Sequence, residues 1–295
     1  MSSTPSAKPE ITILNSMAGR DFEAALDRHV AWGLRWLDLK DGIFGKSVVE
    51  LSDDELSSAA RMIKERGLRV YALSTSLFAE NVEAGEEVFR QKHLGAIPRV
   101  LEIAEALSPI AIRLIAAFTD RRGSVTDAIQ YTKSRAPWLF DLYDEAIERI
   151  SSAGYTAVIE NESLGSLLSG PQEALAFFAS LSNRAHARFT WDVVNMWQVG
   201  TFPTVEVYEA LRPIIGYVHF KGGQSDEPGG PLQWKSALDE ASWPVREITS
   251  RIVQDGACRM ICINPPHGAL RPGTDPGGWV QRDIQYLRAL LEQEV

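Results

Sequence analysis

Four polar residues stand at the ends of four apolar, strand-like segments of this sequence. They are Glu160 in TAVIENE, Asp192 in RFTWDVVN, His219 in IGYVHFKGG and Asn264 in RMICIN. Strands buried on both faces read as continuous apolar runs. A charged group at the end of such a strand therefore needs a partner, a metal or a solvent-filled mouth. Two carboxylates, an imidazole and an amide in this pattern predict a set of converging metal ligands.

The elements that would position these residues alternate between strand and helix along the chain. Amphipathic segments such as SDDELSSAARMIKERG have apolar residues at spacings of three to four. The pattern predicts an α/β protein, a single-domain (β/α)8 TIM barrel over residues 11–295, after a flexible N-terminal tail at 1–10. A doubly wound sheet is disfavoured because its glycine-rich first turn is absent. The strands are expected at Ile11–Leu14, Leu34–Leu39, Arg69–Ser74, Ala111–Ala116, Thr156–Glu160, Arg188–Asp192, Ile215–Phe220 and Met260–Asn264.

The active-site face of such a barrel is formed by the carboxyl ends of the strands, where all four polar residues fall. The segments VIENE, TWDVVN, YVHFKGG and RMICIN, with GGPLQW before a helix, resemble the sugar phosphate isomerase/epimerase group of xylose isomerase-like TIM barrels. The divalent-metal site of that family is a Glu, an Asp, a His and a second Glu, which implies Glu160, Asp192 and His219 as ligands. Asn264 takes the fourth position; its oxygen can bind a metal, but it has no charge and cannot take up a proton. Mixed oxygen and nitrogen ligands suit Mn²⁺, Mg²⁺, Co²⁺ or Zn²⁺.

The resemblance implies a metal-dependent isomerase or epimerase that acts on a sugar, a sugar phosphate or a related polyol-ketone. In that chemistry the metal polarises the substrate, and a carboxylate removes the proton next to the carbonyl to give an enediolate. Glu160 is expected as ligand and base, with Glu162, on the same side at i+2, as a substitute base or an orienting group. Lys221 would donate to a substrate oxygen or pair with a strand-end carboxylate. Because epimerisation usually needs a group on each face, Asn264 favours a scheme with one base.

Four further residues at the same edge are expected to contact a small carbohydrate-like substrate. His267 and Arg271 follow the eighth strand, and Arg271 would meet a phosphate or carboxylate. Trp197 and Trp234 offer aromatic faces on which sugars stack, although barrel loops also use Trp for packing.

Other functions compete with this interpretation. A lyase or dehydratase of the same superfamily cannot be separated from an isomerase by sequence. The replacement at Asn264 also favours a metal-free, non-catalytic binding or partner protein. A zinc-dependent DNA-repair endonuclease is disfavoured, because it requires several more histidines, and His29, His93 and His186 fall in predicted helices or a helix-to-strand loop.

Bulk composition narrows the class of protein. The formal net charge of -9 opposes the phosphate-neutralising role of a nucleic-acid binder. No run approaches the roughly 20 apolar residues of a membrane span. The N-terminal MSSTPSAKPE lacks the apolar core of a secretory signal, and Cys258 and Cys262 are expected to be reduced thiols. We therefore expect a cytoplasmic protein with no nucleic-acid or membrane partner, and the resemblance allows a homo-oligomer.

Overall fold

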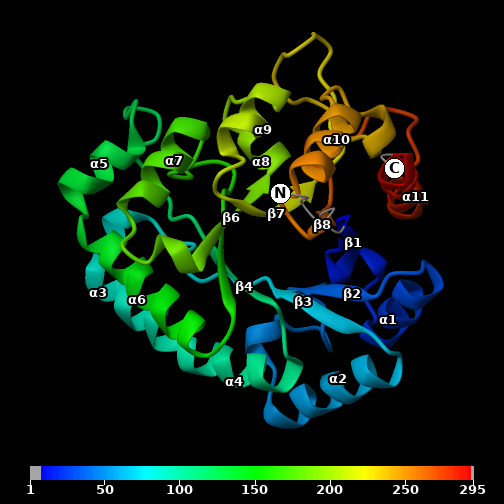
Figure 1. Cartoon of the computed structure of the whole chain (residues 1–295), viewed down its shortest axis with the longest axis horizontal. Coiled ribbons are helices and arrows are strands. Elements are labelled where there is room, and N and C mark those ends of the chain that lie inside the picture. Colours follow the sequence, from blue (N-terminus) through cyan, green and yellow to red (C-terminus); the bar gives the residue numbers. More distant parts are fainter. Residues whose placement is uncertain (1–7, 294–295) are drawn as a thin grey trace, which may run out of the picture.

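Eight parallel strands line the centre of the molecule in the computed structural model, which describes residues 8–293 (Figure 1). All eight predicted strands are present, with small differences at their ends. Residues 1–7 of the predicted tail lie outside the described residues, and Glu10 already belongs to the first strand. The strands are β1 Glu10–Ile13, β2 Trp36–Leu39, β3 Arg69–Leu73, β4 Ala111–Ile115, β5 Thr156–Glu160, β6 Ala187–Asp192, β7 Ile215–Phe220 and β8 Met260–Ile263.

Helices surround the strands and bury their apolar faces against them (Figure 1). The amphipathic segment at 86–107 forms two helices, because Gly95 interrupts it and Pro98 is tolerated only in the first turn of the second one. Among residues 8–293, no helix combines the length and apolar character needed to cross a membrane. The helices are α1 Phe22–Ala31, α2 Asp53–Glu65, α3 Glu86–Lys92, α4 Ile97–Leu107, α5 Ala128–Arg135, α6 Trp138–Ser152, α7 Pro171–Ser180, α8 Val193–Gln198, α9 Val205–Leu211, α10 Val245–Asp255 and α11 Trp279–Gln293.

The sheet is nearly closed. Each strand from β2 to β8 pairs in parallel with the next, and β8 pairs with β1. Between β1 and β2 the contact is a bridge from Leu14 to Asp38, and the Thr12 hydroxyl donates to the Trp36 carbonyl at 2.7 Å. This arrangement confirms the predicted single (β/α)8 TIM barrel.

The strand register brings the polar strand ends close together, although Glu160 pairs with Thr190 and therefore lies two residues short of Asp192 in register. Glu160 lies opposite Ile115 of β4, Asp192 lies opposite His219, and His219 lies opposite Cys262 of β8. The apolar residues before these positions are buried, which fixes the register because a slip would expose them. The carboxyl ends of β5, β6 and β7 therefore present their polar side chains at the same end of the barrel.

Candidate active site at the carboxyl end of the barrel

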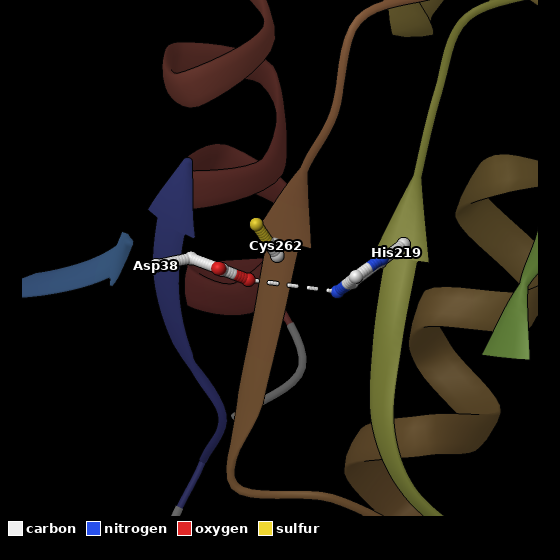
Figure 2. Close-up of side chains that lie close together, drawn as sticks. All are labelled: Asp38, His219 and Cys262. Atoms are coloured by element: carbon white, nitrogen blue, oxygen red, sulfur yellow. Dashed lines mark ion pairs between the residues drawn. The ribbon is translucent and has the colours of Figure 1, made fainter. Parts of the chain in front are cut away.

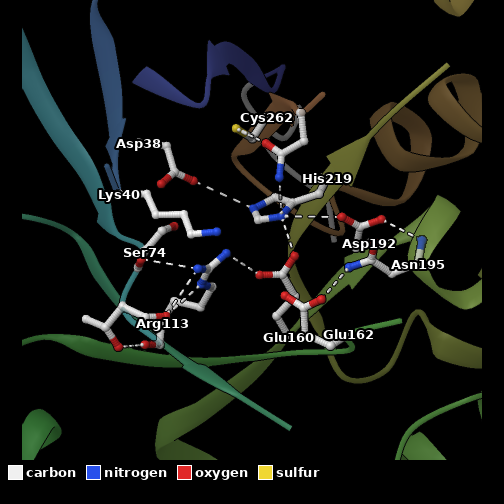
Figure 3. Close-up of polar contacts among 12 residues, drawn as sticks. Asp38, Lys40, Ser74, Arg113, Glu160, Glu162, Asp192, Asn195, His219 and Cys262 are labelled. Atoms are coloured by element: carbon white, nitrogen blue, oxygen red, sulfur yellow. Dashed lines mark hydrogen bonds and ion pairs between the residues drawn. The ribbon is translucent and has the colours of Figure 1, made fainter. Parts of the chain in front are cut away.

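Glu160, Asp192 and His219 converge as the sequence predicted (Figure 3). All three are buried, and each offers one ligand atom within 4.8 Å of the others. His219 Nδ1 lies 2.7 Å from Glu160 Oε1 and 3.9 Å from Asp192 Oδ2. The structure thus brings the three residues into one cluster, while their role as ligands stays a prediction.

The carboxylate of Asp192 is divided between two tasks. Its Oδ1 accepts hydrogen bonds from the backbone N–H groups of Val194 and Asn195, which caps α8. Its Oδ2 is buried and faces the cluster without a well-aligned hydrogen bond, although the Lys221 ammonium lies 2.7 Å away. Local helix capping therefore fixes the orientation of Asp192 and leaves one oxygen open to the cluster.

Asn264, which follows β8, joins the cluster through its amide. Its Nδ2 lies 3.0 Å from His219 Nδ1, and its Oδ1 accepts from Cys262 Sγ at 3.1 Å. One ring nitrogen cannot donate to Glu160 and accept from Asn264 at the same time, so these contacts conflict around His219 Nδ1. Rotating the amide by half a turn would present its oxygen to His219 Nδ1 instead. The oxygens of Glu160, Asp192 and Asn264 would then all face His219 Nδ1, so that lone pairs of four side chains converge.

Arg113 was not predicted as a site residue, yet it is buried against Glu160. Its Nη1 donates to Glu160 Oε2 at 2.5 Å, and its Nη2 donates to the carbonyls of Ser74 and Thr75 at 3.1 Å (Figure 3). Burial alone would raise the pKa of Glu160, but His219 and the Arg113 guanidinium outweigh it and hold the pKa well below its usual range. The sequence signal was available, because an arginine inside the apolar run AIRLIAA needs a buried partner.

Asp38 of β2 was also missed, and it faces the other side of the imidazole. Its Oδ2 lies 3.7 Å from His219 Nε2 (Figure 2). The same oxygen accepts a hydrogen bond from the Tyr217 hydroxyl at 2.8 Å. Asp38 Oδ1 and His219 Nε2 are both buried without a hydrogen-bond partner in the part of the chain that the structure describes. Histidines that bind metals usually turn their second ring nitrogen toward a carboxylate or carbonyl, and Asp38 occupies that position here. Cys262, which lies beside this pair, is a buried free thiol as expected.

Lys221 extends into the cluster from the end of β7. Its ammonium lies 2.7 Å from Asp192 Oδ2, 2.8 Å from Asn195 Oδ1 and 2.7 Å from His267 Nε2. Of the two predicted roles for Lys221, the pairing with a strand-end carboxylate is the one that the structure shows. His267 is half-buried at the mouth, and burial, followed by the charge of Lys221, lowers its pKa to about 4. At neutral pH His267 therefore accepts a hydrogen bond from Lys221.

Glu162 lies at the rim of the same cluster. It is half-buried, and its Oε2 is 3.5 Å from Asn195 Nδ2 (Figure 3). Burial and then the nearby charge of Glu160 raise the pKa of Glu162. Unlike Glu160, it forms no ion pair among the described residues, so its carboxyl group is free to contact a ligand.

The predicted substrate-binding tryptophans and Arg271 lie apart from the cluster. Trp197 is only 2% exposed, donates its indole N–H to the Gly230 carbonyl and packs edge-on against Phe202, so of the two roles left open for it the structure shows packing. The reason is that the loop after β7 covers it. Trp234 and Arg271 stack on each other at 4.8 Å and both bind Asp226. No hydrogen bond or ion pair of residues 8–293 joins them to Glu160, Asp192 or His219.

The residues present fit a divalent cation. Glu160 Oε1, Asp192 Oδ2 and His219 Nδ1 meet with the Asn264 amide, and a cation among them would remove the conflict at His219 Nδ1. The buried Asp192 Oδ2 without an aligned hydrogen bond and the carboxylate behind the imidazole also match this use. The set of oxygen and nitrogen atoms without a thiolate differs from a structural zinc site and is compatible with the predicted Mn²⁺, Mg²⁺, Co²⁺ or Zn²⁺.

Known proteins give the same fold. A family described as xylose isomerase-like TIM barrel matches residues 26–290. No curated protein matches the sequence. Among solved structures, 3-keto-D-glucoside 4-epimerase YcjR from E. coli superposes with a TM-score of 0.70 at 15% identity, covering 96% of this chain and 100% of that one.

Two further structures are similar over comparable lengths. D-psicose 3-epimerase from Clostridium cellulolyticum H10, in a structure with D-tagatose, has a TM-score of 0.71 at 13% identity and covers 96% of this chain and 98% of its own. A xylose isomerase-like TIM barrel protein from Mycobacterium smegmatis, in complex with magnesium, has a TM-score of 0.67 at 15% identity and covers 92% and 89%. At such identities these likenesses establish the fold alone.

Proposed function

This chain belongs to the xylose isomerase-like TIM barrel family, and from that premise we propose that it is an enzyme that moves a proton next to the carbonyl of a small carbohydrate-like substrate. The observation that carries the proposal is the convergence of Glu160 Oε1, Asp192 Oδ2 and His219 Nδ1 in a buried cluster at the carboxyl end of the barrel. Buried carboxylates that keep their charge are arranged where a cation or a reacting group must be held. The mouth of a barrel is also where such enzymes place their chemistry.

The three converging residues would hold a divalent cation, with Asn264 as a neutral fourth ligand. When bound, such a cation supplies Lewis-acid polarisation of the substrate's oxygens. Asp38 would keep the imidazole of His219 in the orientation in which Nδ1 faces the cluster. Arg113 would keep Glu160 charged, since it binds Oε2 and leaves Oε1 to the cluster.

Glu162 is the proposed proton carrier. Glu160 is fully buried and uses both carboxylate oxygens, one with His219 and one with Arg113, which makes it a ligand rather than a mobile base. Glu162 reaches the rim and is partly exposed. Among residues 8–293 it forms no ion pair with a lysine, arginine or histidine. A positioned carboxyl group of this kind contributes about 10²–10⁴-fold to a proton transfer.

The neutral Asn264 favours a reaction that needs one base. Epimerisation usually takes a proton from one face and returns it on the other, which requires two groups. Aldose–ketose isomerisation needs one base and a nearby acid, and dehydration by a lyase can begin with the same proton removal. We therefore place isomerisation first and keep the epimerase and lyase reactions as variants of the same proposal.

Solvent hydrogen exchange tests this function directly. Purified protein supplied with Mn²⁺ would be incubated in D₂O with a panel of aldoses, ketoses, their phosphates and keto-glycosides, and deuterium next to the carbonyl would be followed by mass spectrometry. We expect incorporation that chelation abolishes and that Glu162→Gln reduces about 10²–10⁴-fold. Glu102→Gln, the same change at an exposed position on α4, is the matched control. No incorporation with any member of the panel, in a protein that binds the cation, would contradict the proposal.

A second candidate is a metal-free binding protein. It is favoured by Asn264 and by the pairing of both carboxylates with internal cations, Glu160 with Arg113 and Asp192 with Lys221. Metal analysis after supplementation separates the two candidates. Stoichiometric cation supports the enzyme, and a protein that stays metal-free supports the binding function.

A further inference from the structure

The ammonium of Lys221 occupies a position that the proposed cation would also need. Lys221 is 5% exposed, and its Nζ lies 2.7 Å from Asp192 Oδ2. Asp192 Oδ1 is not available to either cation, because it caps α8 through the N–H groups of Val194 and Asn195. Both cations must therefore use the same oxygen, Oδ2.

The second internal cation does not have this conflict. Arg113 binds Glu160 through Oε2, whereas the oxygen that faces His219 Nδ1 is Oε1. Its guanidinium is also held by the carbonyls of Ser74 and Thr75, so it is fixed on the far side of the carboxylate. Arg113 can therefore keep its contact with Glu160 Oε2 while a divalent cation binds. Lys221 cannot keep its contact with Asp192 Oδ2 unchanged.

The surroundings of Lys221 offer the ammonium somewhere else to go. Besides Asp192 it already contacts Asn195 Oδ1 at 2.8 Å and His267 Nε2 at 2.7 Å, and the backbone carbonyl of Lys221 is held by the Trp243 indole N–H at 3.1 Å. A small rotation of the side chain would lengthen the contact with Asp192 while the other two acceptors remain. The lysine would then stay at the mouth and not enter bulk solvent.

We propose that Lys221 is a built-in competitor for the divalent cation: it neutralises Asp192 in the metal-free protein and withdraws toward Asn195 and His267 when the cation binds. This inference rests on the proposed function, because it assumes that the cluster binds a divalent cation. It accounts for the ion pair between Lys221 and Asp192 Oδ2 inside the buried cluster. It also means that the affinity of the site is set by a residue that is not itself a ligand.

The test compares cation affinity in two lysine variants by calorimetric titration with Mn²⁺. Lys221→Met removes the ammonium and keeps the apolar stem, and we expect at least tenfold tighter binding. Lys40→Met is the matched control, since Lys40 also points toward the cluster (Figure 3) but pairs with Asp41 at 3.8 Å. We expect a change of less than about threefold there, because two charges that do not share a ligand interact through a partly solvated path.

The outcomes separate the two proposals. Equal affinity in wild type and Lys221→Met, or an equal gain in both variants, overturns the competitor role and leaves the metal function standing. Binding only in Lys221→Met supports the competitor role at its strongest. Absence of Mn²⁺ binding in both the wild type and Lys221→Met overturns the metal function and the competitor role together.

A measurement on the native side chain covers the case in which Lys221→Met does not fold because Asp192 loses its counter-charge. The buried ammonium should give a slowly exchanging ¹⁵N signal in the wild type, assigned by its loss in Lys221→Arg. Titration with diamagnetic Zn²⁺ should shift that signal and speed its exchange with water. The midpoint of this change should coincide with the midpoint of the Zn²⁺ binding curve. A signal that stays unchanged at saturating Zn²⁺ overturns the proposal.

Discussion

The protein buries carboxyl groups in two regions and treats them differently. Glu160, at the mouth of the barrel, has a pKa held far below its usual range because Arg113 and His219 outweigh the effect of burial. Asp283, on α11, is equally buried, and burial raises its pKa to about 7, although its Oδ1 accepts the Leu238 N–H at 2.7 Å. No ion pair to Asp283 occurs among residues 8–293, and the adjacent Arg282 binds Asp239 and Glu240 instead.

The difference shows what burial does by itself. An acid taken out of water becomes neutral unless a cation accompanies it. At the mouth, Arg113 from β4 pairs with Glu160, which remains charged, and Lys221 from the end of β7 pairs with Asp192. The acidic groups at the mouth are therefore paired with basic side chains from other strands, whereas Asp283 is not. Substitutions that remove or add charge at the mouth test this difference.

The largest effect on cation binding is expected from removing the charge of Asp192. In Asp192→Asn an oxygen can still cap α8, but the open Oδ2 of the cluster loses its charge. We expect Mn²⁺ affinity to fall on the order of 100-fold or more, since outer groups alone account for about 10–100-fold. Asp127→Asn is the control, because Asp127 caps α5 in the same way at an exposed position. Unchanged affinity in calorimetric titration would show that Asp192 is not a ligand.

Removing Arg113 should make Glu160 resemble Asp283. Arg113→Met breaks a fully buried ion pair, and we expect the free energy of unfolding in urea to fall by about 3–5 kcal/mol. Arg90→Met, which breaks an exposed pair with Glu86, should cost less than about 1 kcal/mol. A loss of similar size in both variants would mean that Glu160 does not depend on its arginine.

Asp38 supports the cluster from behind and should have an intermediate effect. Asp38→Asn keeps an oxygen for the Tyr217 hydroxyl but removes the charge that faces His219 Nε2. We expect cation affinity to fall about 10–100-fold. Tyr217→Phe, which leaves the Asp38 charge in place, should change it far less. The orienting role is excluded if both variants bind the cation like the wild type.

Adding a carboxylate to the cluster should raise cation affinity, in contrast to the losses expected above. Asn264→Glu restores the second glutamate of the family pattern, and we expect roughly tenfold tighter cation binding from the extra charge, or about 1.4 kcal/mol. Asn264→Gln has the same length without the charge and should give no gain. Weaker binding in Asn264→Glu would show that residue 264 does not face the cation.

The smallest effect concerns Asp283. Its folded-state pKa lies above the unfolded value, so its contribution to stability is complete below the unfolded pKa and is lost as the pH rises through about 7. Between pH 6 and pH 8 this one group should lower the free energy of unfolding by about 1 kcal/mol. Asp283→Asn should remove that decrease, as measured by urea unfolding of both proteins at the two pH values. The same decrease in the variant would assign it to other groups.

Part of the site could be predicted from the sequence because it follows from local pattern. The apolar runs that end near Glu160, Asp192 and His219 predict both the strands and the polar side chain that stands at the carboxyl end of each one. The N-cap at Asp192 is likewise local, since an aspartate before a helix caps it. Trp197 shows the limit, because its exposure depends on a loop more than 30 residues further along that covers it.

The sequence alone determined the alternation of strands and helices, the barrel that follows from it, and which polar residues end the strands. Only the tertiary structure decided which of these groups meet and which charges accompany them. Arg113 reaches Glu160 across 47 positions of sequence, and Tyr217 reaches Asp38 across 179. Such pairings depend on the curvature and closure of the whole sheet, whereas periodicity describes only one strand at a time.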